Sequence, residues 1–348
     1  MSELDRLVVE VHSLPTIMCP SFNMHLRVDV LLLLLFLSCL HLLLLAQPTL
    51  GLGSTNTNPN ITAVSNSSFF IAKPGCQPNC GDITVPYPFG IGNDSGCSIS
   101  SWLHLTCNTS YDPPKLFLGS LQVLSISQTE VRVQNTVAAL CYNQAGNQTY
   151  YSPAGMGWGD AWPYTFSETN KFTVVGCNVY ALISCSHQGR EFSTGCLSAC
   201  SNGTDVVAGN NCTGIGCCQS NIPEGLKNFD GSLGFVGNHT EVLSFDPCMY
   251  AFLGEQDSFQ FNGTSDFNDP ASFINRTLGN VPVVLDFVIG NQTCPEAQNS
   301  SASLCQNNAS CNNSTNGYGG YLCSCLNGYE GNPYLSPGCT GSVVDPKP

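Results

Sequence analysis

Residues 294–339 read CPEAQNSSASLCQNNASCNNSTNGYGGYLCSCLNGYEGNPYLSPGC and hold six cysteines in 46 positions. Free thiols at this density would oxidise or exchange, whereas disulfides would stabilise a loop-rich chain with only a small apolar core. Disulfides persist outside the cytosol and are rare inside it. The segment therefore predicts a small disulfide-linked module in a protein that is exported to an oxidising compartment.

The cysteine-rich character extends upstream, since the chain has 21 cysteines and thirteen of them fall between residues 74 and 250. Short apolar runs between them are interrupted by Gly, Pro and Asn, and several alternate apolar with polar residues, which indicates antiparallel strands. The strand candidates are Leu121–Val133, which is long enough for two strands, Phe172–Val175, Val179–Ile183 and Glu241–Phe245. Helical periodicity is weak, and its best candidate is Asp266–Leu278. We predict a mainly β fold of small, disulfide-rich antiparallel β modules.

The N-terminal region contains one long apolar run, VLLLLLFLSCLHLLLL at Val30–Leu45. Arg27 precedes it and small residues follow it, which is the order of a cleavable secretory signal. The run is slightly short for a membrane span, so we favour a cleaved signal over an uncleaved anchor. Acidic residues before Met24 are unusual in a signal, and a natural start at Met24 would remove them. The C-terminal residues have no anchor pattern, so we expect a secreted, extracellular product that is membrane-associated only if the run is retained.

N-glycosylation motifs agree with export. The pattern Asn-x-Ser/Thr begins fifteen times across the chain, and although polar linkers produce some by chance, this number fits a heavily glycosylated surface better than a bare one. Such sites belong to the surface of a secreted protein. The predicted acceptors are Asn60, Asn66, Asn93, Asn108, Asn147, Asn202, Asn211, Asn238, Asn262, Asn275, Asn291, Asn299, Asn308, Asn312 and Asn313.

Composition divides the chain into six predicted parts. They are an upstream segment with the signal (1–46), a polar linker (47–72), a cysteine-rich domain (73–250), a connecting β segment (251–293), the small module (294–340) and a tail (341–348). In the connecting segment, Val281–Ile289 has the composition of a strand, and Pro282 near its start favours an edge position.

The net charge is −14, with only ten Lys and Arg in 348 residues and no basic run, which argues against nucleic-acid binding. Catalytic patterns are also lacking. No Gly-x-Ser-x-Gly motif occurs, no pair of carboxylates is singled out by spacing, and after the apolar run only His104, His187 and His239 remain. We therefore predict a protein that is not an enzyme and that uses no cofactor.

The order of the last six cysteines resembles an EGF-like domain, because Cys323-Ser324-Cys325 is followed by Gly328-Tyr329 and a final Gly338-Cys339. The resemblance implies the pairs Cys294–Cys311, Cys305–Cys323 and Cys325–Cys339, whereas the sequence alone leaves other pairings open. Calcium-binding EGF-like domains carry acidic residues before the first cysteine, and residues 289–293 contain none. We predict no calcium site, and no zinc site either, because the module lacks His and belongs to an exported chain.

The first cysteine cluster opens with KPGCQPNCGDITVPYPFGI at residues 73–91 and continues through GIGCCQ at 214–219 to FDPCMYAF at 245–252. In this order, the motifs from about Lys73 to Thr340 resemble the extracellular region of plant wall-associated receptor kinases, a galacturonan-binding domain followed by an EGF-like repeat. The resemblance implies non-catalytic binding of pectin or galacturonan in the plant cell wall. The transmembrane and kinase parts of that family do not follow Cys339, so kinase activity is not expected of this chain. The alternative is a protein-interaction module that pairs with full-length wall-associated receptors or peptide ligands.

Thirteen is an odd number, so the first cluster cannot pair wholly within itself. Cys185 has no place in the family pattern and is the candidate free thiol, either for an intermolecular bridge or as an inert buried residue. The vicinal Cys217 and Cys218 are expected to bind different partners, because a ring between neighbours is strained. The cysteines expected in disulfides of unknown pairing are Cys76, Cys80, Cys97, Cys107, Cys141, Cys177, Cys196, Cys200, Cys212, Cys217, Cys218 and Cys248.

Sugar sites combine aromatic faces for stacking with polar side chains for hydroxyls. The candidate sugar-binding residues are Tyr150, Tyr151, Trp158, Trp162, Tyr164, Lys115 and Arg132. Tryptophans in a small loop can equally fill a thin core, and Tyr87 and Phe89 fit a buried turn better than a sugar site. A direct binder of acidic pectin should offer cations, yet residues 74–250 hold five Lys and Arg against twelve acids. Calcium-bridged contacts, or binding to uncharged methyl-esterified pectin, therefore stay open.

Overall fold

The computed structural model describes residues 71–92, 96–159, 161–187, 190–209, 212–237 and 239–341, without the side chains of 185–187, 190–192 and 239. The predicted signal, most of the polar linker and most of the tail lie outside the described residues, as do the acceptors Asn60, Asn66, Asn93, Asn211 and Asn238. Within these ranges, no helix is long and apolar enough to cross a membrane.

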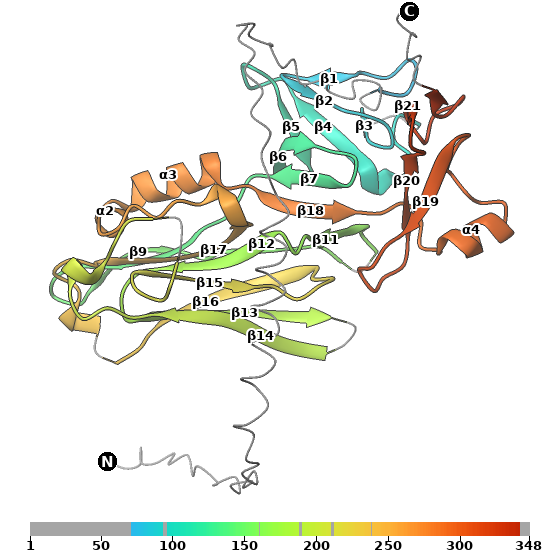
Figure 1. Ribbon diagram of the computed structural model, residues 1–348. Coiled ribbons are helices and arrows are strands. Elements are labelled where there is room, and N and C mark those ends of the chain that lie inside the picture. The colour runs from blue at the N-terminus through green and yellow to red at the C-terminus, as the bar shows by residue number, and fades with distance from the viewer. Residues whose placement is uncertain are drawn as a thin grey trace, which may run out of the picture. The chain divides into compact units, whose positions relative to one another are not determined.

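The largest sheet has seven strands in the order β11-β18-β7-β6-β5-β4-β3 (Figure 1). Their bounds are β3 Gly90–Ile91, β4 His104–Asn108, β5 Lys115–Leu118, β6 Leu121–Ile126, β7 Glu130–Val133, β11 Tyr164–Phe166 and β18 Val283–Phe287. Only β3 and β4 pair in parallel. Apolar residues alternate along β5 and β7, which buries Leu116, Leu118, Val131 and Val133 on one face. The alternation predicted at Leu121–Val133 thus forms two strands, as expected.

Two further sheets carry most of the remaining strands. A five-stranded sheet has the order β15-β12-β17-β8-β9, with bounds Cys217–Asn221, Asn170–Val175, Cys248–Glu255, Ala138–Tyr142 and Gln148–Ser152. A four-stranded sheet has the order β10-β16-β13-β14, with bounds Gly155–Gly157, Asn228–Phe235, Val179–His187 and Arg190–Ser198. All pairings in both sheets are antiparallel.

Short elements complete the described part of the chain. Three two-stranded sheets pair β1 Asn79–Cys80 with β2 Ile83–Thr84, β19 Ala309–Asn313 with β20 Tyr321–Cys325, and β21 Tyr329–Glu330 with β22 Thr340–Gly341. The α-helices are α2 Ser265–Asn268, α3 Pro270–Asn280 and α4 Cys294–Asn299. Single 3-10 turns occur at η1 Ser101–Leu103, η2 Gly203–Asp205, η3 His239–Glu241 and η4 Gln256–Ser258.

The predicted helix at Asp266–Leu278 is present but divided. Asp269 caps α3 by accepting a hydrogen bond from the Ser272 N–H at 3.0 Å, and Pro270 occupies the first turn. A proline there starts a helix well but cannot continue a preceding one. The α3 helix packs Phe273 against Tyr250 of β17, with stacked ring centroids 4.0 Å apart.

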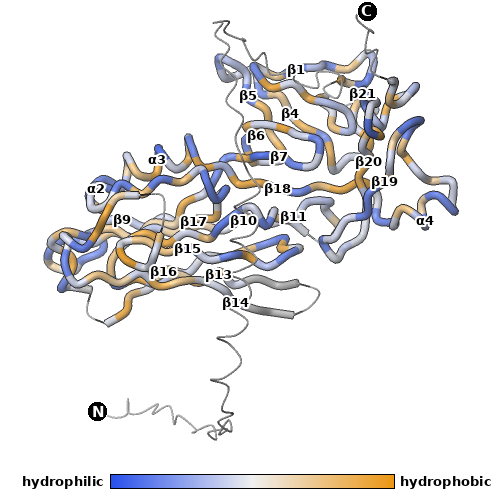
Figure 2. Tube along the Cα trace, in the orientation of Figure 1, coloured by the Kyte–Doolittle hydropathy of each residue, from blue (hydrophilic) through white to orange (hydrophobic). Residues whose placement is uncertain are grey.

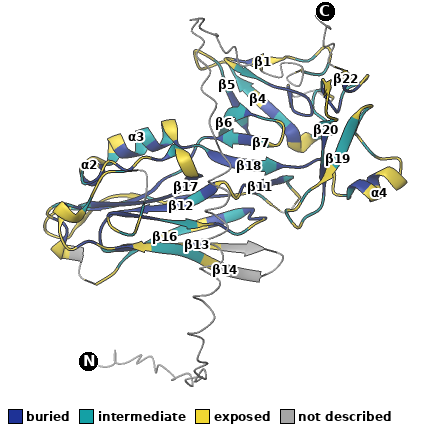
Figure 3. Ribbon diagram, in the orientation of Figure 1, coloured by how far each residue is buried: buried dark blue, intermediate teal, exposed yellow. Residues whose placement is uncertain are grey.

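Two buried apolar clusters lie beneath the sheets. One joins the seven-stranded sheet to parts of the other two large sheets and to the C-terminal module, and the second lies between β17 and α3. Figure 2 shows hydrophobic residues along β18 and β17, and Figure 3 shows both strands largely buried. The mainly β, disulfide-rich fold class is confirmed, and the EGF-like identity of the C-terminal module stays a prediction.

Nine disulfides connect the described cysteines. In the C-terminal module they are Cys294–Cys311, Cys305–Cys323 and Cys325–Cys339, the same pairs that the resemblance implies. The first cluster forms Cys76–Cys97, Cys80–Cys107, Cys141–Cys248, Cys177–Cys200, Cys196–Cys218 and Cys212–Cys217. The vicinal cysteines therefore bind different partners. The Cys185 side chain lies outside the described residues, and its free thiol stays a prediction, although the twelve other cysteines of the cluster pair with one another.

The prediction of a strand at Glu241–Phe245 is wrong. Its first residue ends η3, and the backbone N–H groups of Phe245 and Asp246 both donate to the Val242 carbonyl, at 3.0 and 2.8 Å. This is a tight turn that buries Val242 and Leu243 without any strand partner. A short apolar run fits a buried turn as well as a strand, and periodicity alone does not separate them.

The prediction that the strand after Pro282 lies at the edge of its sheet is also wrong. The β18 strand lies between β11 and β7, and both neighbours pair with it. Pro282 precedes the strand, so its missing N–H removes no ladder bond, and its carbonyl accepts from the Glu255 N–H at 2.9 Å. The β17 strand runs across residue 250, where the sequence places a domain boundary. The connecting segment is thus built into the sheets of the preceding residues.

Candidate functional site

A polar and aromatic surface forms on the open face of the seven-stranded sheet. The register places Thr106, Phe117 and Gln122 directly opposite one another on β4, β5 and β6, and it places Asn108 opposite Lys115. Directly paired residues project from the same face of a sheet. Since Leu116 and Leu118 occupy the buried face, these five residues lie on the other one. We call this surface the β4–β5–β6 face.

Tyr111, in the turn between β4 and β5, extends the β4–β5–β6 face. Tyr111 is 44% exposed, its ring centroid lies 6.1 Å from that of Phe117, and the Lys115 ammonium lies 4.7 Å from the Tyr111 ring centroid. No carboxylate of the described residues lies within ion-pair distance of Lys115. The face thus presents a cation beside a partly exposed aromatic ring, which suits a sugar ring that carries a carboxylate.

Arg132, another candidate sugar-binding residue, is already paired with carboxylates of the protein. Its guanidinium bonds to Glu255 at 2.6 Å and to Glu130 at 3.2 Å. Hydrogen bonding to Glu255 is the main cause that raises the pKa of Arg132, and it stabilises the charged form. Two carboxylates therefore neutralise this cation, which ties β7 to the end of β17 and is not free for an anionic ligand.

The predicted aromatic stretch does not form one site. Tyr150 and Tyr151 are 42% and 63% exposed on β9, an outer strand of the five-stranded sheet. Tyr164 is fully buried, and its hydroxyl donates to the Trp102 carbonyl at 3.1 Å. Trp158 donates its indole N–H to the Tyr164 carbonyl at 2.7 Å. The Trp158 and Tyr164 side chains therefore serve the core rather than a sugar surface.

Trp162 is half-buried and packs on Trp102, with ring centroids 5.3 Å apart. Trp102 is 40% exposed and is not among the sequence candidates, and neither are Tyr111 and Phe117. The alternation in Lys115–Leu118 could have placed Phe117 beside Lys115. Nothing in the sequence indicates that Tyr111 folds back over this pair.

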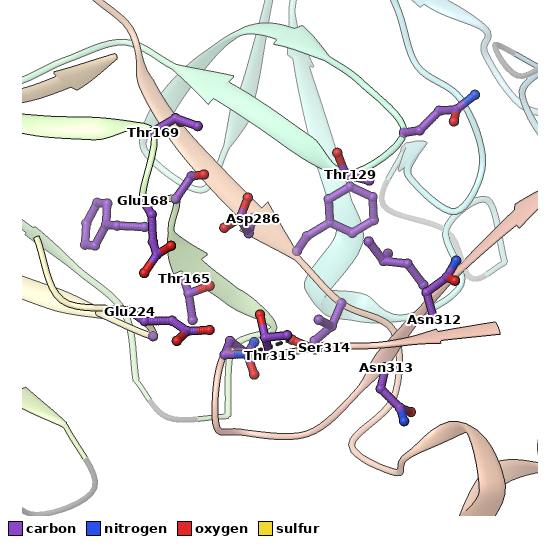
Figure 4. A pocket seen from close by; sticks show the side chains of 18 of the residues that line it. Thr129, Thr165, Glu168, Thr169, Glu224, Asp286, Asn312, Asn313, Ser314 and Thr315 are labelled. Atoms are coloured by element: carbon purple, nitrogen blue, oxygen red, sulfur yellow. Dashed lines mark hydrogen bonds between the residues drawn. The ribbon is translucent and has the colours of Figure 1, made fainter. Parts of the chain in front are cut away.

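A pocket of about 570 Å³ lies on a different part of the same sheet. Its walls are the end of β11 with the following turn, the end of β18, residues 224–225 and the β19–β20 hairpin, so we call it the hairpin pocket. Figure 4 shows Asp286, Thr165, Glu168 and Glu224 gathered around one space, with Ser314 and Thr315 of the hairpin beside them. Segments more than a hundred residues apart build this pocket, which explains why no sequence motif marks it.

The hairpin pocket is acidic. Glu168 and Glu224 are exposed at its rim, and Asp286 is half-buried in its wall. Burial raises the pKa of Asp286 to about 6, the Ser167 hydroxyl opposes this by hydrogen bonding to the carboxylate, and the charges of Glu130 and Glu168 raise the pKa further. No Lys, Arg or His of the described residues lines the pocket. In the same residues, no group of three or more His, Cys, Asp or Glu is placed to hold a metal ion.

Comparisons with known proteins bear on the β4–β5–β6 face. Residues 76–136, which span β1 to β7, match the family model described as wall-associated receptor kinase galacturonan-binding. Over 76% of the chain, the sequence is 39% identical to wall-associated receptor kinase 2 and 36% identical to wall-associated receptor kinase 5, both of Arabidopsis thaliana. The match covers 34% of each relative, so the chain spans about a third of their length. No solved structure matches.

Proposed function

We propose that this chain binds pectin without catalysis, because residues 76–136 match the galacturonan-binding family model and the similarity to wall-associated receptor kinases extends over three quarters of the chain. The bound form is galacturonan, the acidic polymer of pectin. The proposed location is the extracellular space or the cell wall, in agreement with the disulfides and the glycosylation motifs.

The observation that carries the proposal is the position of Lys115. It lies inside the matched residues 76–136, beside the exposed Tyr111 ring and free of any described carboxylate. A stacked sugar ring on Tyr111 would bring its carboxylate within reach of the Lys115 ammonium, while Gln122 and Thr106 face the same side and can bond to hydroxyls. One suitably placed cation supports acid recognition better than the low overall count of Lys and Arg suggests.

Lys115→Gln is expected to weaken binding of de-esterified oligogalacturonides by about tenfold, because one charge-assisted hydrogen bond is lost. Isothermal titration with the glycosylated protein measures this, with and without EGTA. Binding of a methyl-esterified oligomer should change little. Lys171→Gln is the matched control, since Lys171 lies on β12, outside the matched residues, and bonds to Asn221. Equal losses in the two variants would contradict the assignment, and no retention on de-esterified pectin in either condition would overturn pectin binding itself.

The acceptor Asn108 provides an independent test of the β4–β5–β6 face. Asn108 pairs with Lys115 across the strands, and its side-chain oxygen accepts from the N–H and hydroxyl of Ser110 at 2.9 and 2.6 Å. The motif predicts glycosylation at Asn108, but a glycan there would cover the proposed surface, so the proposal requires Asn108 to be unoccupied in the secreted protein. Glycopeptide mass spectrometry measures the occupancy, with the exposed acceptor Asn147 as the positive reference. Full occupancy at Asn108 would exclude this face as the polysaccharide surface.

A protein-interaction role, with full-length receptors or peptide ligands as partners, is the second candidate function. The acidic hairpin pocket favours it, because a polyanion such as galacturonan would be repelled there. Crosslinking in the absence of pectin tests this role. A protein partner captured without pectin supports it, and capture that depends on pectin contradicts it.

A further inference from the structure

Two residues in the wall of the hairpin pocket, Thr165 and Asp286, lie side by side. Thr165 on β11 and Asp286 on β18 are directly opposite in the register, so their side chains project together from one face of the sheet. Both line the pocket, and Figure 4 shows them facing the same space. Thr165 is only 1% exposed as a residue, and it lines the pocket. A hydroxyl has one donor and two acceptor positions, so the Thr165 side chain can accept a hydrogen bond from a ligand in the pocket.

The carboxylates of the pocket also lack cationic partners. Neither Glu168 nor Glu224 has a Lys or Arg within ion-pair distance among the described residues. The nearby cations are engaged elsewhere, since Arg132 pairs with Glu130 and Glu255, and Lys227 donates to the Trp162 carbonyl at 2.7 Å. The negative charge of the pocket is therefore open to compensation by a ligand.

The residues that line the pocket favour a cationic side chain over a sugar as the ligand. Phe166 and Phe287 contribute to the lining, but each is 1% exposed, and their rings pack on Trp158 and Phe89. They offer an apolar wall and no open aromatic face for a sugar ring to stack on. Lys and Arg combine an aliphatic stem, which packs on apolar walls, with a cationic head that bonds to carboxylates.

We propose that the hairpin pocket binds an Arg or Lys side chain of a protein partner, with Asp286 and Thr165 receiving the cationic head and Glu168 and Glu224 attracting it at the rim. Arg fits better than Lys, since its guanidinium can donate to two acceptors at once. The pocket lies apart from the β4–β5–β6 face, so the inference does not depend on pectin binding.

Titration calorimetry with the full glycosylated chain tests the proposal. The probe is an acetylated and amidated peptide with three Ser-Gly-Arg repeats, and its control has citrulline in place of each Arg, which keeps the shape and removes the charge. The Arg peptide should bind and the citrulline peptide should not. Binding should strengthen as the pH rises through about 6, because protonation of Asp286, which faces Glu130, Glu168 and Glu224, competes with the cation.

Variants separate the pocket from the general attraction between a basic peptide and an acidic protein. Asp286→Asn should lower the affinity at least tenfold, and Glu168→Gln by several-fold, whereas Asp82→Asn, which removes an exposed charge outside the pocket, should change it less than twofold. Thr165→Val leaves the charge unchanged and should still weaken binding several-fold. Equal losses for the pocket variants and Asp82→Asn would overturn the proposal, as would binding of the citrulline peptide. Galacturonan binding measured on the same variants should be retained, so a failure here is distinct from a failure of the pectin proposal.

Discussion

Replacing Cys141 and Cys248 together by alanine is expected to lower the free energy of unfolding by about 5 kcal/mol. Their disulfide spans 107 residues of sequence, the longest separation of the nine, and it joins directly paired positions of β8 and β17. A cross-link restricts the unfolded chain more when it closes a longer loop. Both cysteines are 3% exposed, so the alanines also lose buried contacts.

The Cys212→Ala/Cys217→Ala variant is the matched control. That disulfide spans only 5 residues, so the same loop-closure relation gives about 2 kcal/mol. Equilibrium urea unfolding of the oxidised proteins measures both losses, and free-thiol labelling beforehand checks that the other disulfides have formed. If the short-loop variant lost as much stability as the long-loop variant, loop closure would not be the dominant contribution of these bonds.

Local patterns in the sequence were enough to predict the strands that alternate. In Leu121–Val133, β7 follows the pattern because every second side chain is apolar and buried. In β6 an irregularity between Val123 and Ser125 shifts the register, so that Val123 and Ile126 are the buried residues. The same reasoning failed for β18, whose position depends on which strands pair with it. The partners of β18 are β7 and β11, which lie at least 117 residues earlier in the chain. A proline before the strand does not indicate whether such distant strands will pair with both of its edges.

The sites were harder to predict than the strands, for the same reason. Lys115 and Arg132 look equivalent in the sequence, yet only the fold brings Glu255 to Arg132 and leaves Lys115 beside Tyr111. Trp158 and Tyr164 are candidate sugar-binding aromatics in the sequence, but their polar atoms bond to backbone carbonyls inside the structure. The residue type indicates which interactions a side chain can make. Tertiary contacts determine whether its charge or polar atoms are already bonded within the protein or can still bind a ligand.

Asp246→Asn is expected to remove a fall in stability that the natural protein shows between about pH 4 and pH 8. Asp246 is fully buried, and one carboxyl oxygen accepts from the Cys177 N–H while the other has no partner among the described residues. Burial raises the pKa of Asp246 from 3.8 to about 8, and the Cys177 N–H opposes this by stabilising the charged form. The native protein thus holds a proton that the unfolded chain has released across this range.

The sign follows from proton linkage. At Asp246 the folded state binds more protons than the unfolded state between the two pKa values. The contribution of this group to stability is therefore greatest below about pH 4, falls as the pH rises, and levels off above about pH 8. Each unit by which the folded pKa exceeds the unfolded pKa corresponds to about 1.4 kcal/mol of stability. The Asp246 contribution to the free energy of unfolding of the natural protein should therefore fall by a few kcal/mol between about pH 4 and pH 8. Asparagine resembles the protonated acid, keeps an acceptor for Cys177 and has no charge to bury, so the difference between the two proteins should grow with pH.

Urea unfolding at several pH values measures this difference, and subtraction of the two profiles cancels the contribution of Asp286, which titrates in both. Asp246→Ala is the control, because it removes the acceptor as well as the charge and should be less stable than Asp246→Asn at every pH. Parallel profiles for the natural protein and Asp246→Asn would show that Asp246 is ionised in the folded state. A profile that falls with pH by a few kcal/mol less in the asparagine variant than in the natural protein would mean instead that one neutral carboxyl, buried beside the Cys177–Cys200 disulfide, makes the fold more stable in acid than at neutral pH.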